Sequence, residues 1–225
     1  MRGPAVIRQI IFDLDGTLVD SCAVCVQILG DMLADRDSDH AIDPVAARPW
    51  MSLGGAAMVA ALLGPACVDP EKDIMEFRAR YRETVTPSSA LFPGVAMGLT
   101  HFRDAGFSLS ICSNKPQELC EQVLRDTGLR SLFGPVVGLR TGLRAKPELD
   151  LLHATLDALR ATPSECVYVG DSEIDHEVAG KAGMPFVFMS YGYAKPDYRC
   201  EGESFECFRT MSQAVTTRIA PACAA

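Results

Sequence analysis

The sequence predicts an α/β protein in which a doubly wound, mostly parallel sheet carries an inserted α-helical cap domain. Short apolar runs alternate with helical patterns along most of the chain, and the connections between them are short. This alternation is typical of a parallel sheet with helices on both faces. From residue 20 to residue 89, in contrast, helical patterns follow one another and no convincing strand lies among them. We therefore expect a Rossmann-like core, residues 1–19 and 90–225, and a helical cap, residues 20–89.

The predicted strands are short runs rich in apolar side chains. The first is QIIF at residues 9–12, where the apolar side chains are continuous rather than alternating. A continuous run predicts a parallel strand that is covered on both faces. The other predicted strands are residues 108–112, 135–139, 166–169 and 186–189.

Helical patterns separate the predicted strands. Prolines stand at or near several of the helix starts, where the first turn needs no amide hydrogen. Gly106, Gly128 and Gly183 follow three of these segments and suit helix ends. The predicted core helices are residues 93–104, 116–127, 147–160, 173–182 and 210–219, and the predicted cap helices are residues 22–36, 52–63 and 70–85.

Charge and composition narrow the range of partners. The chain of 225 residues has 21 Lys and Arg against 29 Asp and Glu, which gives a formal net charge of −8. An acidic surface repels nucleic acid and anionic lipid, and no apolar run approaches the roughly 18 residues that a membrane span needs. We expect no nucleic-acid or membrane partner, and a monomer or homodimer. The nine cysteines stand mostly among apolar neighbours, which favours reduced thiols and a cytoplasmic location.

Four short motifs lie at or close behind the predicted strands. Ligands bind at the carboxyl ends of the strands in an open parallel sheet, so we expect the topology to bring the motifs to one edge. Among their side chains are the carboxylates of Asp13, Asp15 and Asp171, the hydroxyl of Ser113 and the ammonium of Lys146, which suit a magnesium ion and a phosphoryl group. The motifs are DLDGT at residues 13–17, SNK at 113–115, KP at 146–147 and GDS at 170–172, followed by Asp175.

The two carboxylates of DLDGT can divide the work of phosphoryl transfer. We expect Asp13 to stay ionised and to attack phosphorus, forming an aspartyl-phosphate. Asp15 then protonates the leaving oxygen and later removes a proton from the hydrolytic water, which requires the two pKa values to differ. We expect the hydroxyl of Thr17 to orient a neighbouring oxygen.

The other motifs complete the predicted site. Mg²⁺ prefers oxygen ligands and keeps several waters, so we expect its ligands to be the side chains of Asp13 and Asp171 and the backbone carbonyl of Asp15. Asp175 lies one helical turn beyond Asp171, and we expect it to hold a metal-bound water or Lys146. The residues expected to bind the phosphoryl group or the rest of the substrate are Thr17, Ser113, Asn114 and Lys146.

These motifs resemble those of the haloacid dehalogenase-like superfamily, and specifically its phosphatases with a helical cap after the first strand. The resemblance covers nearly the whole chain and implies a first strand at the centre of the sheet. It implies that Asp13 is the nucleophile and Asp15 the acid and base. The dehalogenases that give the superfamily its name lack the second carboxylate, so the presence of Asp15 argues for phosphatase chemistry. The further residues that the resemblance marks as functional are Ser113, Lys146, Asp171 and Asp175.

Within the superfamily, the chain looks most like phosphoglycolate phosphatase. This likeness implies that a small phosphorylated metabolite, 2-phosphoglycolate, is converted to glycolate and phosphate. The cap stretch 48–55 departs from the glycine-rich loop expected there, and within it Arg48 either pairs with a substrate carboxylate or lies on the surface. The stretches that carry the likeness are residues 16–21, 92–95, 113–116 and 191–193.

Other functions stay open at this level. A sugar phosphomutase uses the same nucleophile but returns the phosphoryl group to a sugar, and it must exclude water under its cap. Pyrophosphate and phosphonoacetaldehyde are alternative substrates. A phosphonatase needs a cap lysine that forms a Schiff base, and Lys72 is the only lysine in the cap. A non-catalytic phosphate-binding regulator is a further alternative, against which the retained carboxylates argue.

Overall fold

The computed structural model describes residues 7–219, and within this range six strands form one parallel sheet in the order β3-β2-β1-β4-β5-β6. The first strand lies near the centre, with β2 and β3 on one side and β4 to β6 on the other, as in a doubly wound sheet. The predicted fold class is confirmed. The strands are β1 (Gln9–Phe12), β2 (Ser108–Pro116), β3 (Val136–Leu139), β4 (Cys166–Gly170), β5 (Phe186–Met189) and β6 (Glu203–Phe205).

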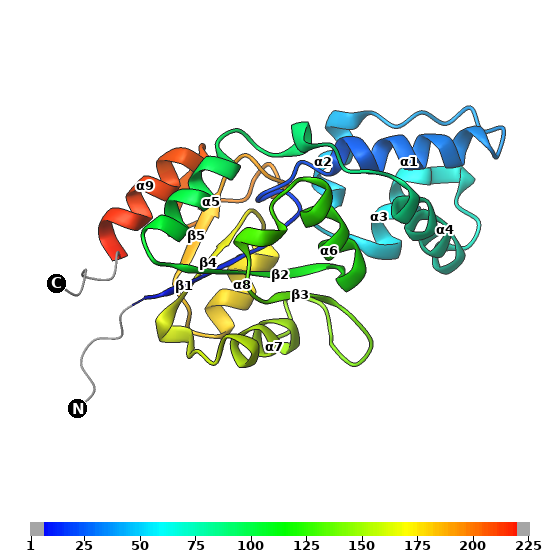
Figure 1. Ribbon diagram of the computed structural model, residues 1–225. Helices are drawn as coiled ribbons and strands as arrows, with labels where there is room; N and C mark the ends of the chain where they lie inside the picture. The colour runs from blue at the N-terminus through cyan, green and yellow to red at the C-terminus, as the bar shows by residue number, and fades with distance from the viewer. Residues whose placement is uncertain (1–6, 220–225) are drawn as a thin grey trace.

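Helices cover both faces of this sheet (Figure 1). Successive side chains of a strand point to opposite faces, so Ile10 and Phe12 belong to one buried cluster and Ile11 belongs to another. The first cluster includes α5, α6 and α9, and the second includes α7 and α8. Apolar burial on both faces therefore stabilises a three-layer core. These helices are α5 (Val95–Asp104), α6 (Gln117–Asp126), α7 (Asp150–Leu159), α8 (Glu173–Lys181) and α9 (Phe208–Ile219).

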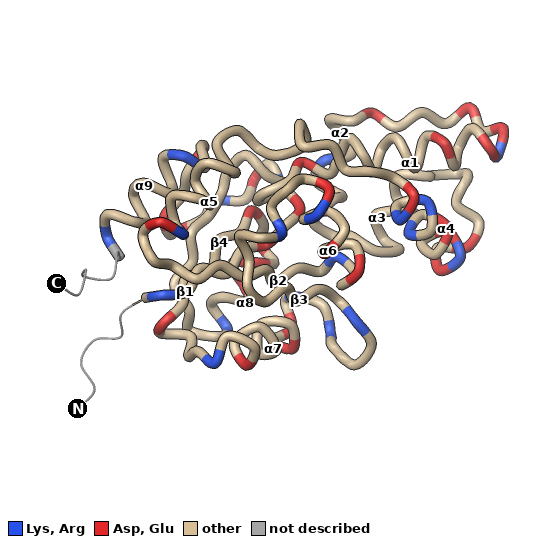
Figure 2. Tube along the Cα trace, in the orientation of Figure 1, with Lys and Arg blue, Asp and Glu red and all other residues tan. Residues whose placement is uncertain are grey.

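Four helices that follow β1 lie together beyond one end of the sheet (Figure 1). They contact mainly one another, and we propose that residues 20–89 form the cap domain. Acidic and basic residues are interspersed along the cap (Figure 2). Arg36, just after the first cap helix, pairs with Asp73 at 2.8 Å and with Glu76 at 2.6 Å, and both of these carboxylates lie on the last cap helix. The helices are α1 (Cys22–Ala34), α2 (Pro44–Met51), α3 (Gly55–Leu63) and α4 (Pro70–Glu83).

One cap helix, α2, is missing from the sequence-based prediction. Pro49 lies inside it, and an internal proline normally ends or kinks a helix, so the segment does not read as helical. Its start nevertheless carries an ordinary signal. The Asp43 side chain accepts hydrogen bonds from the backbone of Val45 and Ala46, and Pro44 occupies the first turn.

Two boundaries next to the functional motifs differ from the prediction. β2 runs on to Pro116 instead of ending at residue 112, so residues 113–115 belong to the strand. α7 begins at Asp150, so Lys146 lies in the preceding loop and does not begin a helix. β6 was not predicted, because a three-residue strand with exposed polar positions has no clear apolar pattern.

Short 3-10 helices occupy several of the connections. None of the helices within residues 7–219 is long and apolar enough to span a membrane. The 3-10 helices are η1 (Gly64–Ala66), η2 (Ser88–Ala90), η3 (Arg130–Leu132) and η4 (Pro163–Glu165).

Candidate active site

The four sequence motifs meet at the carboxyl ends of β1, β2 and β4, as the topology predicts. They line one cavity of about 190 Å³, whose other wall comes from the cap. Thr17 and Asp175 lie directly behind this lining, because Thr17 donates a hydrogen bond to Asp171 and Asp175 accepts one from Lys146. The motif residues that line the cavity are Asp13, Asp15, Ser113, Asn114, Lys115, Lys146, Asp171 and Ser172.

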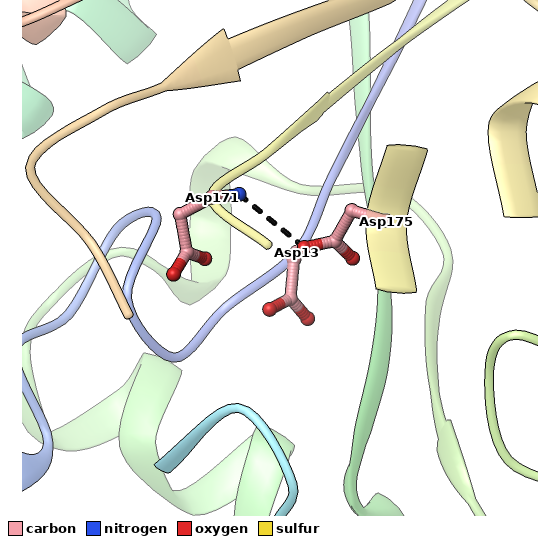
Figure 3. Close-up of side chains that lie close together, drawn as sticks. All are labelled: Asp13, Asp171 and Asp175. Carbon is pink, nitrogen blue, oxygen red and sulfur yellow. Dashed lines mark hydrogen bonds between the residues drawn. The ribbon is translucent and has the colours of Figure 1, made fainter. Parts of the chain in front are cut away.

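Asp13, Asp171 and Asp175 form a buried cluster of carboxylates (Figure 3). One oxygen from each lies within 4.8 Å of the others. Asp13 follows β1, Asp171 follows β4, and Asp175 lies in the first turn of α8. The dashed line in Figure 3 is the hydrogen bond from the Asp171 backbone N–H to Asp175 Oδ2, at 3.3 Å. The fold therefore concentrates three acidic groups where water has little access.

Lys146 brings one positive charge into this cluster. Its Nζ donates to Asp13 Oδ1 at 2.9 Å, to Asp175 Oδ1 at 2.7 Å and to the Tyr168 hydroxyl at 3.0 Å. The side chain is only 3% exposed. Burial lowers the pKa of Lys146, but the charges of Asp13 and Asp175 outweigh burial and hold this pKa above its usual value. Lys146 therefore stays charged. Sequence reasoning missed Tyr168, which carries no signal beyond its place in a buried strand.

Asp175 acts as a support for the lysine and for the loop after β4. Its Oδ1 accepts from Lys146, and its Oδ2 accepts from the Ser172 hydroxyl at 2.7 Å and from the Ser172 backbone N–H at 3.2 Å. Gly170 is needed beside it, because a Cβ at that position would overlap the Asp175 side chain. Asp175 was predicted to hold either a metal-bound water or Lys146, and the structure shows the contact with Lys146.

Asp171 is oriented by two donors. The Thr17 hydroxyl donates to Oδ1 at 2.7 Å, and the Tyr193 backbone N–H donates to Oδ2 at 2.7 Å. The neighbouring oxygen that Thr17 was predicted to orient is therefore a carboxylate oxygen of Asp171. Gly16 has φ +86°, and a Cβ there would overlap the same carboxylate, so this turn requires glycine.

The cluster fits a divalent metal ion. The pKa of Asp13 is raised to about 6, and burial is the largest cause. The charge of Lys146 lowers this pKa, whereas the charges of Asp175 and Asp15 raise it. Burial and the same kind of repulsion raise the pKa of Asp171 well above its usual value. Carboxylate oxygens suit a hard divalent cation, and Asp13 Oδ2 accepts no hydrogen bond from the residues described. We infer that Asp13 and Asp171 would hold such an ion, since its charge relieves their repulsion.

Asp15 has a partner of its own, Lys115. Lys115 Nζ donates to Asp15 Oδ2 at 3.2 Å and to Oδ1 at 3.3 Å, and it lies 4.1 Å from the centroid of the Tyr81 ring on α4. Lys115 was missed as a functional residue although it stands in the SNK motif. Residues two apart in a strand face the same side, so the extension of β2 beyond residue 112 would have placed Lys115 beside Ser113.

Ser113 and Asn114 differ in what they contact. Ser113 is buried and lines the cavity, and its oxygen accepts a hydrogen bond from the Lys115 backbone at 3.4 Å. Its hydroxyl proton donates to none of the described residues. Asn114 instead pairs with the Lys146 backbone in both directions, at 2.7 Å to the N–H and 3.1 Å to the carbonyl. These contacts give Asn114 a role in positioning Lys146.

Comparisons with known proteins agree with this geometry. Residues 10–189 match the family model described as haloacid dehalogenase-like hydrolase. The chain belongs to this family. It is 33% identical over 192 residues to phosphoglycolate phosphatase from Rhodobacter capsulatus, which covers 83% of this chain and 85% of that relative. It is also 33% identical over 198 residues to phosphoglycolate phosphatase from Xanthomonas campestris pv. campestris, which covers 88% of each chain.

A solved structure supports the same membership of the haloacid dehalogenase-like family. The crystal structure of a predicted phosphoglycolate phosphatase from Haemophilus somnus superposes with a TM-score of 0.80 at 25% identity, covering 95% of this chain and 100% of that chain. The resemblance inferred from the motifs is confirmed, and the protein is a phosphatase.

Arg48 of this phosphatase lies away from the cavity lining. Its Nη1 donates to Asp20 Oδ2 at 2.8 Å, and its Nη2 donates to the Tyr191 carbonyl at 3.1 Å. The guanidinium also lies 5.0 Å from the centroid of the Tyr193 ring. Arg48 therefore ties α2 to core loops, and Asp20 already matches its charge. These contacts give no support to the predicted pairing of Arg48 with a substrate carboxylate.

Replacing Lys115 by methionine tests its role beside Asp15. We expect kcat to fall by roughly 10-fold to 100-fold, because Asp15 loses the group that holds its carboxylate toward the cavity. KM should change much less, since Asp15 and Lys115 are not predicted to bind the phosphoryl group. Steady-state phosphate release measures both constants. The conservative variant Lys115→Arg should recover part of kcat, and an unchanged kcat in Lys115→Met would contradict the role.

Proposed function

We propose that this phosphatase hydrolyses small phosphomonoesters through an aspartyl-phosphate on Asp13, with Mg²⁺ held by Asp13 and Asp171. We propose 2-phosphoglycolate as the substrate and glycolate and phosphate as the products. The observation that carries the proposal is the state of Asp13. Asp13 lines the cavity, Lys146 donates to its Oδ1, and its Oδ2 accepts no hydrogen bond from the described residues.

The first step is attack by Asp13 on phosphorus. Its free Oδ2 forms the new bond to phosphorus while the bond from phosphorus to the substrate's leaving oxygen breaks. Lys146 and the Ser113 hydroxyl offset the negative charge on the phosphoryl oxygens. This stabilisation is stronger in the transition state than in the bound substrate. Asp13 and Asp171 would hold a divalent cation, whose positive charge would further stabilise the phosphoryl group.

Asp15 carries the protons in both steps. In its protonated form it gives a proton to the leaving oxygen, which departs as an alcohol. As a carboxylate it then takes a proton from a water molecule, whose oxygen attacks phosphorus and breaks the bond to Asp13. Asp13 is thereby restored and inorganic phosphate is released. Hydrogen bonds from Lys115 hold Asp15 at the cavity wall for both transfers.

Two observations support 2-phosphoglycolate as the substrate. Relatives at 33% identity that cover more than four-fifths of the chain bear the name phosphoglycolate phosphatase. The cavity of about 190 Å³ is below the range of about 300–1,000 Å³ typical of sites for drug-sized ligands, which favours a compact metabolite.

The eight described cysteines are free, which supports the cytoplasmic location expected from the sequence.

Metal removal tests the proposal directly. Purified protein should release phosphate from 2-phosphoglycolate with Mg²⁺, stop when EDTA is added, and recover when excess Mg²⁺ is restored. A colorimetric phosphate assay measures this, and p-nitrophenyl phosphate serves as a substrate without specific recognition. Mg²⁺ should also raise the thermal unfolding midpoint, because it binds the folded carboxylate cluster.

Two outcomes would contradict the proposed function. Interconversion of hexose phosphates without free phosphate would indicate a mutase. If no phosphate were released from a broad panel of phosphorylated metabolites, the proposed phosphomonoesterase activity itself would be contradicted.

A further inference from the structure

Arg78 is a cap residue that lines the same cavity as Asp13. It lies in α4, in the part of the cavity wall that the cap supplies, and the lining also includes Phe77 and Ile74 from the same helix. The residue is partly buried. The cap therefore presents one guanidinium to the space in which the substrate is proposed to bind.

Arg78 differs from the other arginines of the cap in having no partner. Of the five arginines in residues 20–89, the other four each pair with at least one carboxylate at 3.2 Å or less. Within residues 7–219, no hydrogen bond, ion pair or aromatic contact joins Arg78 to another side chain. The four paired arginines are Arg36, Arg48, Arg80 and Arg82.

The other cations of the cavity are also paired. Lys146 contacts Asp13 and Asp175, and Lys115 contacts Asp15. Those two lysines therefore offset charges that belong to the catalytic machinery itself. Among the described residues that line the cavity, Arg78 is the one cation whose charge is not offset by the protein, so it is available to an anionic ligand.

The position of Arg78 indicates which part of a substrate it would meet. The phosphoryl group is proposed to bind at the sheet motifs, so the leaving group extends toward the cap. A guanidinium offers a planar fork of donors that matches a carboxylate in a bidentate pair. Apolar side chains of the same cavity, Phe77, Ile74 and Met51, reduce the local dielectric and strengthen such a pair.

We propose that Arg78 binds a carboxylate on the leaving-group part of the substrate and thereby sets the specificity of the enzyme for phosphorylated hydroxy acids. This inference rests on the proposed function. It gives the role of carboxylate recognition to α4, whereas Arg48, the cap arginine singled out in the sequence, is already paired with Asp20.

The test compares two substrates of equal length. One is 2-phosphoglycolate, and the other is 2-hydroxyethyl phosphate, which has an alcohol in place of the carboxylate. In Arg78→Gln, kcat/KM for 2-phosphoglycolate should fall by about 10-fold to 100-fold, mostly through KM, as expected for loss of a charge-assisted pair. The value for 2-hydroxyethyl phosphate should change by less than about threefold, since no anion is left unpaired. Arg78→Lys should retain part of the preference.

Lys72→Gln is the matched control, because it removes one positive charge from the same helix at a side chain that is 80% exposed and absent from the cavity lining. It should leave both substrates unaffected. Equal losses for both substrates in Arg78→Gln would indicate a structural role and overturn the inference, as would no loss for either.

The wild-type enzyme separates failure of this inference from failure of the proposed function. Hydrolysis of p-nitrophenyl phosphate and 2-hydroxyethyl phosphate without any preference for 2-phosphoglycolate would overturn carboxylate recognition. The same result would still agree with the proposed phosphatase activity. Hydrolysis of none of the three substrates would overturn the proposed function and this inference with it.

Discussion

Asp13→Asn is expected to reduce phosphate release by about 10⁴-fold or more, because the amide cannot form the covalent intermediate of the proposed mechanism. The substitution keeps the size of the side chain and one oxygen that Lys146 can contact. The measurement is steady-state hydrolysis of 2-phosphoglycolate and p-nitrophenyl phosphate. Beryllium trifluoride, which mimics a phosphoryl group, should form an adduct on Asp13 in the wild type and none in the variant.

A stability measurement shows whether that loss is chemical. The pKa of Asp13 is raised on folding from 3.8 to about 6, so this carboxyl costs stability progressively as the pH rises from about 4, and the full cost is present above about pH 6. At pH 7 without metal, Asp13→Asn should therefore unfold at a temperature no lower than the wild type. Retained hydrolysis in Asp13→Asn and Asp13→Ala, or an adduct on another residue, would contradict the mechanism.

Lys146→Met is expected to cost both activity and stability. The variant leaves Asp13 and Asp175 without the ammonium that both contact. Breaking a buried ion pair from one side costs about 3–5 kcal/mol, and loss of a donor to the phosphoryl oxygens should lower kcat by about 10²-fold to 10³-fold. Urea unfolding and phosphate release measure the two effects.

Two comparisons separate burial from loss of charge alone. Lys181→Met removes an exposed ammonium that pairs with Glu177 at 2.8 Å within α8, and surface pairs of this kind contribute about 0–1 kcal/mol. Adding Asp175→Asn to Lys146→Met should restore part of the stability, since one unpaired buried carboxylate is then neutral. A Lys146→Met protein as stable and as active as the wild type would disprove the role of Lys146.

The order of strands and helices was predictable because it depends on local patterns. Short runs rich in apolar side chains marked five of the six strands found in residues 7–219, and the topology of a parallel sheet then required the strand ends to meet. The elements that were missed lacked such a pattern. Pro49 interrupts α2, and β6 is three residues long with little apolar character. Tertiary contacts support both in spite of their local sequence.

Residue types and their position behind strands were enough, from the amino-acid sequence alone, to predict that Asp13, Asp15, Ser113, Lys146 and Asp171 lie together, and all five line one cavity. Their roles in phosphoryl transfer stay a prediction. The tertiary structure decided how the charges pair. Lys115 reaches Asp15 across 100 residues of chain, and Arg48 reaches Asp20 across 28. An ion pair depends on distances of a few ångströms between side chains, which only the packing of the cap against the sheet determines. The same packing leaves Arg78, which lines the cavity, without a partner among residues 7–219.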